Sequence, residues 1–274
     1  MRFDIVTIFP GFFAGPFDHG ILSRAIADGT VEAVAHDLRA FTEDRHRTVD
    51  DRPFGGGEGM VLKAQPIFEC VESLGVTPKP TRDTTRESVI LLSAQGRPFT
   101  QAMAHRLATL ERVVLICGRY EGVDERVNDM LADEEVSIGD YVLSGGELAA
   151  AVIVDATVRL LPGVLGHADS ARYESFGIAD SELAVDASLG PDGIPRSTHG
   201  AGGILDYPHY TRPAEFRGVA IPELLAGGDH LAIRRWRRRQ ALSKTLRNRP
   251  DLLVNAALSD DDREYLASLM PLNE

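Results

Sequence analysis

The fold is decided by the stretch Val113-Val114-Leu115-Ile116-Cys117-Gly118-Arg119-Tyr120-Glu121-Gly122, in which a short apolar run passes directly into a polar loop with two glycines. The run is rich in β-branched residues and is typical of a strand buried on both faces. In an open parallel sheet, ligands bind beyond the carboxyl ends of the strands, where such loops emerge. We therefore predict a ligand-binding loop at 118–122, with an ordinary strand-to-helix turn as the alternative.

Apolar runs of the same kind recur through the first 165 residues and alternate with helical patterns. Further strands are predicted at residues 5–8, 31–34 and 89–92. Helices are predicted at 16–28 with Gly29 after its end, at 100–110 with Thr100 as N-cap, and at 147–161. This alternation indicates parallel βαβ units with right-handed crossovers, which places this part of the chain in the α/β class.

Three more polar loops contain glycines. The loop 138–147 precedes the Ala- and Val-rich helix, and Ser93-Ala94-Gln95-Gly96 follows a predicted strand. Loops of this kind can enclose a small molecule from two sides. The segment 44–60 carries bases, carboxylates and four glycines, which can bring backbone amides and guanidinium groups up to a polar ligand. A solvated surface loop is the alternative interpretation of that segment.

Several common functions are excluded. The segment Gly55-Gly56-Gly57-Glu58-Gly59 lacks the ending of a P-loop and the third glycine of a dinucleotide-binding turn. The eight histidines form no H-E-x-x-H motif, and two cysteines cannot build a disulfide framework or a thiolate zinc site. The longest apolar run has seven residues, too short to span a bilayer, and Asp4 interrupts any signal-peptide core, so we expect a cytoplasmic protein without a membrane partner.

Charge is unevenly distributed along the chain. The net charge of −12 by itself argues against a nucleic-acid partner. However, residues 207–249 contain ten bases and three acids, so this segment carries +7 and the remainder −19. A strongly basic helix is predicted at 229–246, followed by a short acidic helix at 259–269 with Ser259 as its cap. A basic module on an acidic body is the resulting prediction, with a solvated helix face as the alternative.

The segment 166–203, between the acidic body and the basic module, differs from both in composition. Residues 166–203 lose all periodicity and are rich in Gly, Ser, Asp and Ala, which predicts a mobile lid or linker. The segment that follows, 203–213, contains Asp206, one histidine, two tyrosines and two prolines. Because the prolines restrict its conformations, they help to hold Asp206 in a fixed place. A merely structural proline-rich turn is the alternative.

Five long motifs follow one another along the chain: DRHRTVDDRPFGGGEGM at 44–60, CGRYEGVDER at 117–126, SIGDYVLSGGE at 137–147, RLLPGVLGH at 159–167 and LDYPHYTRP at 205–213. In this order and spacing they resemble the bacterial tRNA (guanine-N1)-methyltransferase family of trefoil-knotted SPOUT methyltransferases. The resemblance implies an α/β fold, a SPOUT-type parallel sheet with a C-terminal trefoil knot, followed by a small, mostly α-helical C-terminal domain. It also implies a cofactor-binding domain at 1–165, a flexible lid at 166–203 and a basic tRNA-binding domain at 204–274.

The same resemblance implies the reaction and its partners. The family transfers a methyl group from S-adenosyl-L-methionine to N1 of the guanine at position 37 of tRNA, beside the anticodon. A tRNA with guanines at positions 36 and 37 is therefore implied as substrate, rather than DNA. An obligate homodimer is implied, with the active site shared between subunits. Magnesium dependence is suggested for the family, but the sequence predicts no protein cage and no metal ligands.

Site residues carry over from the matching motifs. Guanine N1 bears a proton, so the base must be deprotonated as it attacks the methyl group. Asp206 matches the general base, and Arg159 matches the arginine that offsets negative charge on O6. The resemblance assigns cofactor binding to Ser93, Ala94, Gly96, Gly118, Tyr120, Glu121, Gly122, Ile138, Gly139, Asp140, Tyr141, Val142, Leu143, Gly145 and Gly146. It assigns tRNA binding to Asp50, Asp51, Arg52 and Gly59, while the basic helix adds Arg234, Arg235, Arg237 and Arg238.

Three residues depart from the family pattern, namely Glu58, Ala94 and Phe54, where members usually have proline, proline and tyrosine. Ala94 predicts a looser wall of the cofactor pocket, and Glu58 places a carboxylate near a loop that faces RNA. Other functions stay open at this point. They are methylation of a different RNA base by a related knotted enzyme, RNA binding without catalysis, and metal-dependent hydrolysis built on Asp50, Asp51 and Asp140.

Overall fold

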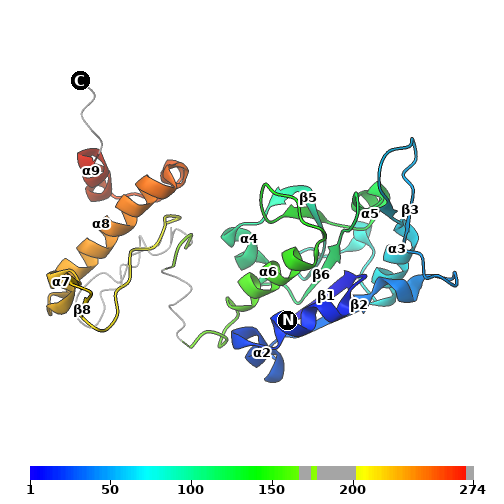
Figure 1. Cartoon of the computed structure of the whole chain (residues 1–274), viewed down its shortest axis with the longest axis horizontal. Coiled ribbons are helices and arrows are strands. Elements are labelled where there is room, and N and C mark those ends of the chain that lie inside the picture. Colours follow the sequence, from blue (N-terminus) through cyan, green and yellow to red (C-terminus); the bar gives the residue numbers. More distant parts are fainter. Residues whose placement is uncertain (167–173, 178–201, 270–274) are drawn as a thin grey trace. The chain divides into compact units, whose positions relative to one another are not determined.

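The computed structural model describes residues 1–166, 174–177 and 202–269. The chain divides into two compact units, Met1–Gly166 and His167–Glu274, and each is described by itself (Figure 1). Most of the predicted lid, residues 167–173 and 178–201, lies outside the described residues. Among the helices that are described, none is long and apolar enough to cross a membrane.

A five-stranded sheet with the order β2-β1-β6-β5-β7 forms the centre of the first unit. All neighbouring strands run parallel, and β1 pairs in register with both β2 and β6. The strands are β1 (Arg2–Thr7), β2 (Glu32–Asp37), β5 (Glu87–Pro98), β6 (Arg112–Cys117) and β7 (Glu134–Ser137). The predicted α/β fold with a parallel sheet is thus confirmed, whereas the trefoil knot stays a prediction.

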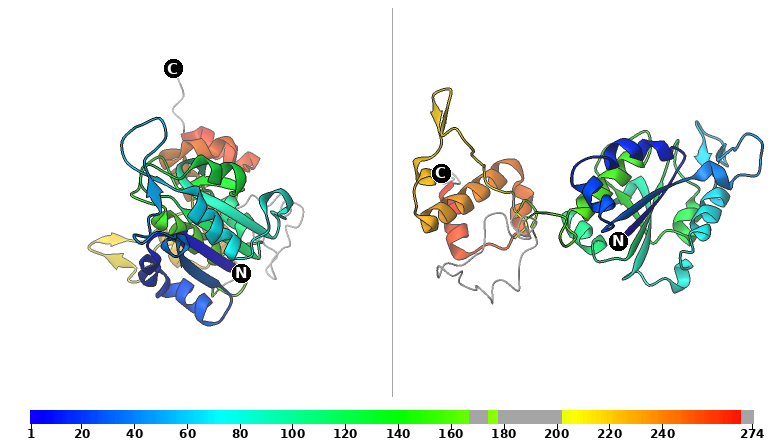
Figure 2. Two further views of the ribbon diagram at one scale, coloured as in Figure 1. Left: turned by 90° about the vertical axis from the view of Figure 1, so that its right-hand side faces the viewer. Right: turned by 90° about the horizontal axis from the view of Figure 1, so that it is seen from below.

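Helices cover both faces of this sheet, as the views in Figures 1 and 2 show. On one face of the sheet, α2 (Gly20–Ala27), α4 (Gln101–Leu107) and α6 (Glu147–Val158) pack against strand residues such as Leu115 and form the first apolar layer. The second layer joins α3 (Ala64–Ser73) and α5 (Glu125–Met130) to the alternate residues, such as Val114 and Ile116. Because successive side chains of a strand point to opposite faces, one apolar run supplies both layers.

Short elements complete the first unit. They are η1 (Pro10–Phe13), α1 (Ala14–Phe17), η2 (Leu38–Phe41), β3 (Asp50–Asp51), β4 (Val61–Leu62) and η3 (Lys79–Thr81). The single helix predicted at 16–28 is wrong, because His19 is extended and Gly20 has φ of +71°, which separates α1 from α2. The expected Thr100 cap is confirmed, since its hydroxyl oxygen accepts from the Met103 N–H at 3.3 Å.

Two further expectations need correction. Ser93–Gly96 was expected to be a loop, but these residues lie within β5, where the pairing with β7 shifts between Leu92 and Arg97. The prediction also lacked β7 itself, together with α3 and α5. The signal for β7 is weak because Glu134 and Glu135 occupy half of a short strand at the sheet edge.

The described residues of the second unit, 174–177 and 202–269, are mostly helical. They contain the hairpin β8 (Glu215–Phe216) and β9 (Val219–Ala220), then α7 (Glu223–Ala226), α8 (His230–Asn248), η5 (Pro250–Val254) and α9 (Asp260–Leu269). Their buried apolar cluster is formed by Ile204, Ala241, Leu242 and Leu266. The two predicted helices are confirmed, and so is the role of Ser259 as a cap. The structure adds Asp229 as the cap of α8, because its carboxylate accepts from the backbone N–H groups of Leu231 and Ala232.

Candidate active site

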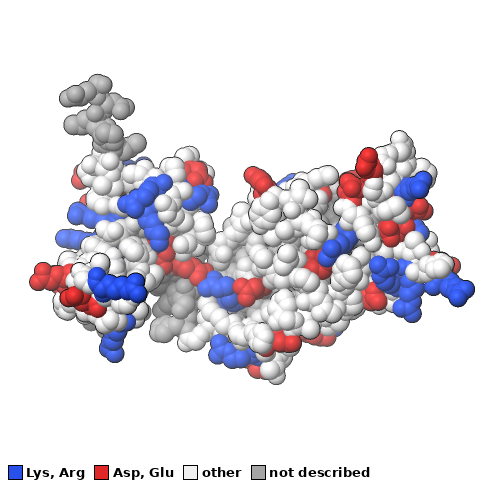
Figure 3. All heavy atoms as spheres, viewed as in Figure 1, with Lys and Arg blue, Asp and Glu red and all other residues white. Residues whose placement is uncertain are grey.

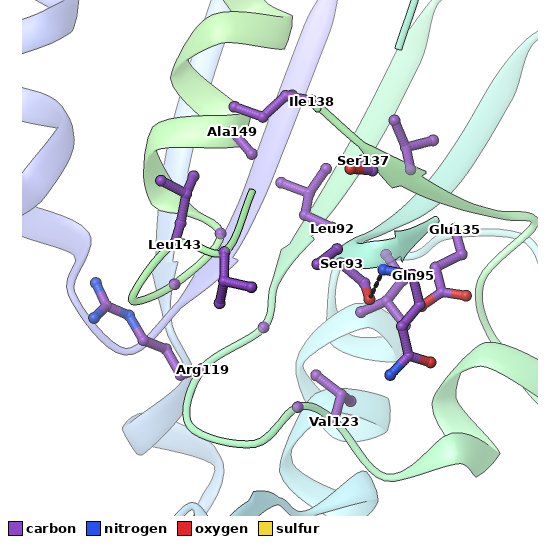
Figure 4. Close-up of a pocket in the computed structure, with 18 of the residues that line it drawn as sticks. Leu92, Ser93, Gln95, Arg119, Val123, Glu135, Ser137, Ile138, Leu143 and Ala149 are labelled. Carbon is purple, nitrogen blue, oxygen red and sulfur yellow. Dashed lines mark hydrogen bonds between the residues drawn. The ribbon is translucent and has the colours of Figure 1, made fainter. Parts of the chain in front are cut away.

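A cavity of about 210 Å³ lies at the carboxyl edge of the sheet in the first unit. Three segments line it, one from β5, one from the loop after β6 and one from the loop between β7 and α6. Figure 4 shows Ser93, Gln95 and Glu135 on one side of the cavity and Arg119 and Leu143 on the other. The parallel strands bring these segments together because their carboxyl ends meet at one edge.

The structure places almost all predicted cofactor residues around this cavity. The lining includes Ser93, Ala94, Gly118, Tyr120, Glu121, Gly122, Ile138, Gly139, Tyr141, Val142, Leu143, Gly145 and Gly146. Gly96 and Asp140 are outside the lining. A Cβ at Gly96 would collide with the backbone of Val136, so this glycine permits the close approach of β5 to β7.

Two of the lining loops are joined by their backbones. The Gly146 N–H donates to the carbonyl oxygen of Gly118 at 2.9 Å. A Cβ at Gly146 would lie 2.8 Å from the Cα of Cys117, and one at Gly145 would collide with the Arg119 side chain. These two glycines are therefore required for the loops to pack against each other.

A buried ion pair between Arg119 and Glu147 holds the same loops together. Arg119 donates to the Glu147 carboxylate from Nε at 3.0 Å and from Nη2 at 2.8 Å, and its Nη1 donates to the Ser144 carbonyl oxygen at 3.0 Å. Thr7, at the end of β1, donates its hydroxyl to the other oxygen of Glu147 at 2.7 Å. Glu147 is only 1% exposed, so its charge depends on these partners.

Sequence reasoning missed both Arg119 and Glu147 as site residues. Each lies inside a quoted motif, but a charged residue in a loop gives no sign that its partner is buried. The guanidinium of Arg119 also lies 4.6 Å from the ring centroid of Phe9, so one of its faces packs on that ring. Arg119 is thus held by two separate segments of the first unit, Phe9 after β1 and the stretch from Ser144 to Glu147.

The loop 44–60, which carries the predicted tRNA-binding residues Asp50, Asp51, Arg52 and Gly59, is joined to the lining of the cavity through β3 and β4. Asp50 and Asp51 pair with Leu62 and Val61 in this two-stranded ladder. The Glu121 N–H then donates to the Met60 carbonyl oxygen, and the Leu62 N–H to that of Gly122, each at 3.0 Å. The loop is therefore fastened to the lining segment 118–122.

The middle of this loop extends away from its attachment. Gly59 lies so close to Glu121 that an added Cβ would be 2.5 Å from the glutamate side chain. Arg52 and Glu58 are exposed, and Phe54 is fully exposed. The loop thus presents polar and aromatic side chains beside the cavity without adding to the core.

The two predicted catalytic residues belong to different units. Arg159 follows the last turn of α6 in the first unit, where it is partly buried and donates its backbone N–H to the Asp155 carbonyl oxygen at 3.3 Å. Asp206 belongs to the second unit. Their approach to one guanine stays a prediction.

Asp206 is held by a dense set of hydrogen bonds. Its backbone N–H donates to Ser175 Oγ at 2.9 Å, and the neighbouring Leu205 N–H donates to Thr245 Oγ1 on α8 at 3.0 Å. The Tyr207 N–H donates to Asp206 Oδ1 at 2.8 Å, and His209 Nε2 lies 3.0 Å from Oδ2. The carboxylate is therefore oriented by its own segment and by helix α8.

The four predicted tRNA-binding arginines of α8 differ in their surroundings. Arg234 is half-buried and Arg235 is exposed. Arg237 places its guanidinium 4.9 Å from the ring centroid of Tyr207. Figure 3 shows basic side chains over α8 on the face drawn.

Arg238 has a structural role that the sequence did not reveal. It forms an ion pair with Asp262 of α9 at 2.7 Å, and the two side chains are only 12% and 9% exposed. Burial alone would raise the pKa of Asp262, but hydrogen bonds from Arg238 and Ser259 outweigh it and hold the pKa below its ordinary value.

Metal and thiol chemistry find no support in the described residues. Within residues 1–166, 174–177 and 202–269, no group of three or more His, Cys, Asp or Glu side chains could hold a metal ion. A hydrolase built on Asp50, Asp51 and Asp140 is therefore not supported. Burial raises the pKa of Cys70 to about 12 and that of Cys117 well above the usual thiol range, so both are poor nucleophiles.

Comparison with known proteins gives a consistent result. The family model described as tRNA (Guanine-1)-methyltransferase TrmD matches residues 1–255. The tRNA (guanine-N(1)-)-methyltransferase of Koribacter versatilis is 61% identical over 269 residues, covering 98% of both chains. The proteins of the same name from Geobacter metallireducens and Dictyoglomus turgidum are 47% and 49% identical, each covering 98% of this chain and 98% and 96% of their own.

Proposed function

The chain belongs to the tRNA (guanine-1)-methyltransferase family, and we propose that it transfers a methyl group from S-adenosyl-L-methionine to N1 of the guanine at position 37 of tRNA. The observation that carries this proposal is the cavity at the carboxyl edge of the sheet, which is lined by the family motifs at 118–122 and 138–146. Its position matches the ligand-binding edge of parallel sheets.

The chemistry of the lining suits this cofactor. Leu92, Val123, Ile138 and Leu143 give it apolar walls for a purine ring. Glu121, Glu125 and Glu135 add carboxylates that suit ribose hydroxyls and positively charged groups. When bound, the cofactor supplies an electrophilic sulfonium methyl group.

Two residues of the chain would handle the proton and the charge of the guanine. We propose that Asp206 takes the proton from N1, so that the ring nitrogen gains a lone pair for attack. Arg159 would then offset the negative charge that develops on O6. The rigid hydrogen bonding of Asp206 supports its assignment, because a general base must be held at a defined position.

We further propose a homodimer in which Asp206 of one subunit serves the cavity of the other. An exposed apolar surface on the first unit supports this arrangement. Leu148 and Val152 lie one turn apart on the outer face of α6, and both are exposed together with Phe9, Tyr141 and Val142. A second copy of the chain would bury this surface.

The basic second unit is proposed to bind the anticodon arm of tRNA. Arg235 and the other exposed bases of α8 can neutralise backbone phosphates, whereas Asp50, Asp51 and Arg52 lie on a loop fastened to the lining of the cavity. In this division of labour, residues 1–165 bind the cofactor and residues 204–274 bind tRNA.

The decisive experiment is methyl transfer to defined tRNA transcripts. Purified protein with labelled S-adenosylmethionine is expected to methylate a transcript with guanines at positions 36 and 37, and nucleoside mass spectrometry should find 1-methylguanosine. Transcripts with adenine at position 37 should accept no label. Transfer to another base or another RNA, with none to this guanine, would overturn the proposal.

A further inference from the structure

The side chain beside the proposed general base is His209. Its Nε2 lies 3.0 Å from Oδ2 of Asp206. Because an ionised carboxylate only accepts hydrogen bonds, the hydrogen in this contact belongs to the imidazole. The other carboxylate oxygen, Oδ1, accepts from the Tyr207 N–H at 2.8 Å. Each oxygen of Asp206 therefore has one donor from its own segment.

Packing against the ring of Tyr207 holds the His209 imidazole in this position. The rings of His209 and Tyr207 have their centroids 4.4 Å apart with planes at 39°. The guanidinium of Arg237 lies 4.9 Å from the centroid of the same Tyr207 ring. Tyr207 thus connects the imidazole to helix α8, and the imidazole is fixed without entering the core.

The exposures of the two side chains differ in an informative way. The Asp206 side chain is 24% exposed, whereas that of His209 is 65% exposed. A side chain so open to solvent contributes little to the apolar core, so a tightly placed histidine here has a task other than folding. Among the described residues, Asp206 is the one polar partner of Nε2 in His209.

We infer that His209 is a positioning residue for Asp206, an inference that rests on the proposed function of Asp206 as the base. With one donor on each oxygen, the carboxylate plane cannot rotate freely, and one lone pair on each oxygen is left for the guanine N1–H. The proton moves from N1 to Asp206, and His209 keeps its own hydrogen throughout. Loss of the imidazole donor leaves the carboxylate free to turn away from N1.

Two variants separate the donor from the ring. His209→Phe keeps an aromatic ring against Tyr207 but has no donor, whereas His209→Gln loses the ring and keeps an N–H donor. We expect His209→Phe to lower the single-turnover rate of methyl transfer about 10- to 100-fold, the effect of one hydrogen bond to a charged group. We expect His209→Gln to keep most of the rate, with unchanged melting temperature and cofactor affinity for both.

The controls make each outcome decisive. Tyr210→Phe, on the same segment but without a contact to Asp206 among those described, should leave the rate unchanged. A wild-type rate for His209→Phe, or an equal loss in both His209 variants, would overturn the positioning role. If Asp206→Asn itself stayed fully active, the base assignment would fail instead. Loss of activity in Asp206→Asn with a normal His209→Phe would refute this inference alone.

Discussion

The two units of this molecule use their charged residues in different ways. In the first unit, apolar layers on both faces of a sheet hold the sheet and its helices together, and the buried pair Arg119–Glu147 holds the loops that line the cavity. Among the described residues of the second unit, four buried apolar side chains form the core, and helices α8 and α9 are also joined by polar contacts such as the pair Arg238–Asp262. The basic residues of a small unit therefore contribute to its own fold, besides the tRNA binding that we propose for them.

The largest effect is expected at Asp206, the residue of the second unit that we propose as the general base. Asp206→Asn should lower the rate of methyl transfer by about 10²- to 10⁴-fold, the usual contribution of a general base. Because the cavity belongs to the first unit, cofactor affinity measured by calorimetry should not change. A loss of cofactor affinity in Asp206→Asn would contradict the proposal that the first unit alone binds the cofactor.

The next effect tests the buried ion pair between Arg119 and Glu147 in the first unit. Glu147→Ala leaves the Arg119 guanidinium without its buried carboxylate, and we expect a loss of about 3–5 kcal/mol in the free energy of unfolding. Cofactor affinity should fall as well, because Arg119 holds the Ser144 carbonyl and lines the cavity. Denaturant unfolding and calorimetry measure the two quantities.

A solvent-exposed pair in the same unit provides the control for that change. Arg86 and Glu111 form an ion pair at 2.8 Å with side chains 65% and 64% exposed. Glu111→Ala should change the free energy of unfolding far less than Glu147→Ala does, since water screens such exposed pairs. Equal losses in the two variants would mean that burial does not set the strength of these pairs.

A smaller effect distinguishes two arginines of α8. Arg238→Ala should destabilise the second unit by about 2–3 kcal/mol, because it removes charged hydrogen bonds to Asp262. Arg235→Ala should leave stability unchanged and weaken tRNA binding with a reduced salt dependence. Thermal unfolding and filter binding at several salt concentrations measure these effects, and a stable Arg238→Ala protein would contradict the first part.

The smallest effect is a pH dependence of the second unit. The pKa of Asp262 is lower in the folded chain than its ordinary value, so its contribution to stability is present above the ordinary carboxyl pKa of about 3.9. That contribution is lost as the pH falls through the depressed value. Denaturant unfolding at neutral and acidic pH should therefore show a smaller pH-dependent loss for Asp262→Asn than for the wild type. An unchanged slope would contradict this assignment.

Local features of the chain were predictable where one segment carries the whole signal. The run 113–117 and the glycines after it predicted both β6 and the loop that lines the cavity. Thr100 and Ser259 predicted helix starts, because an N-cap acts within its own turn. Strand β7 was missed, since a short edge strand with two glutamates has no apolar run.

Contacts between distant segments were beyond such reasoning. By itself, the sequence determined the parallel sheet, the glycine loops and the uneven charge, because strand burial and helix capping depend on neighbouring residues. Only the tertiary structure decided that Thr7 meets Glu147, that Arg238 is occupied by Asp262, and that His209 lies against Asp206. The energy of a buried polar group depends on the partners that folding brings to it, and no local pattern records them.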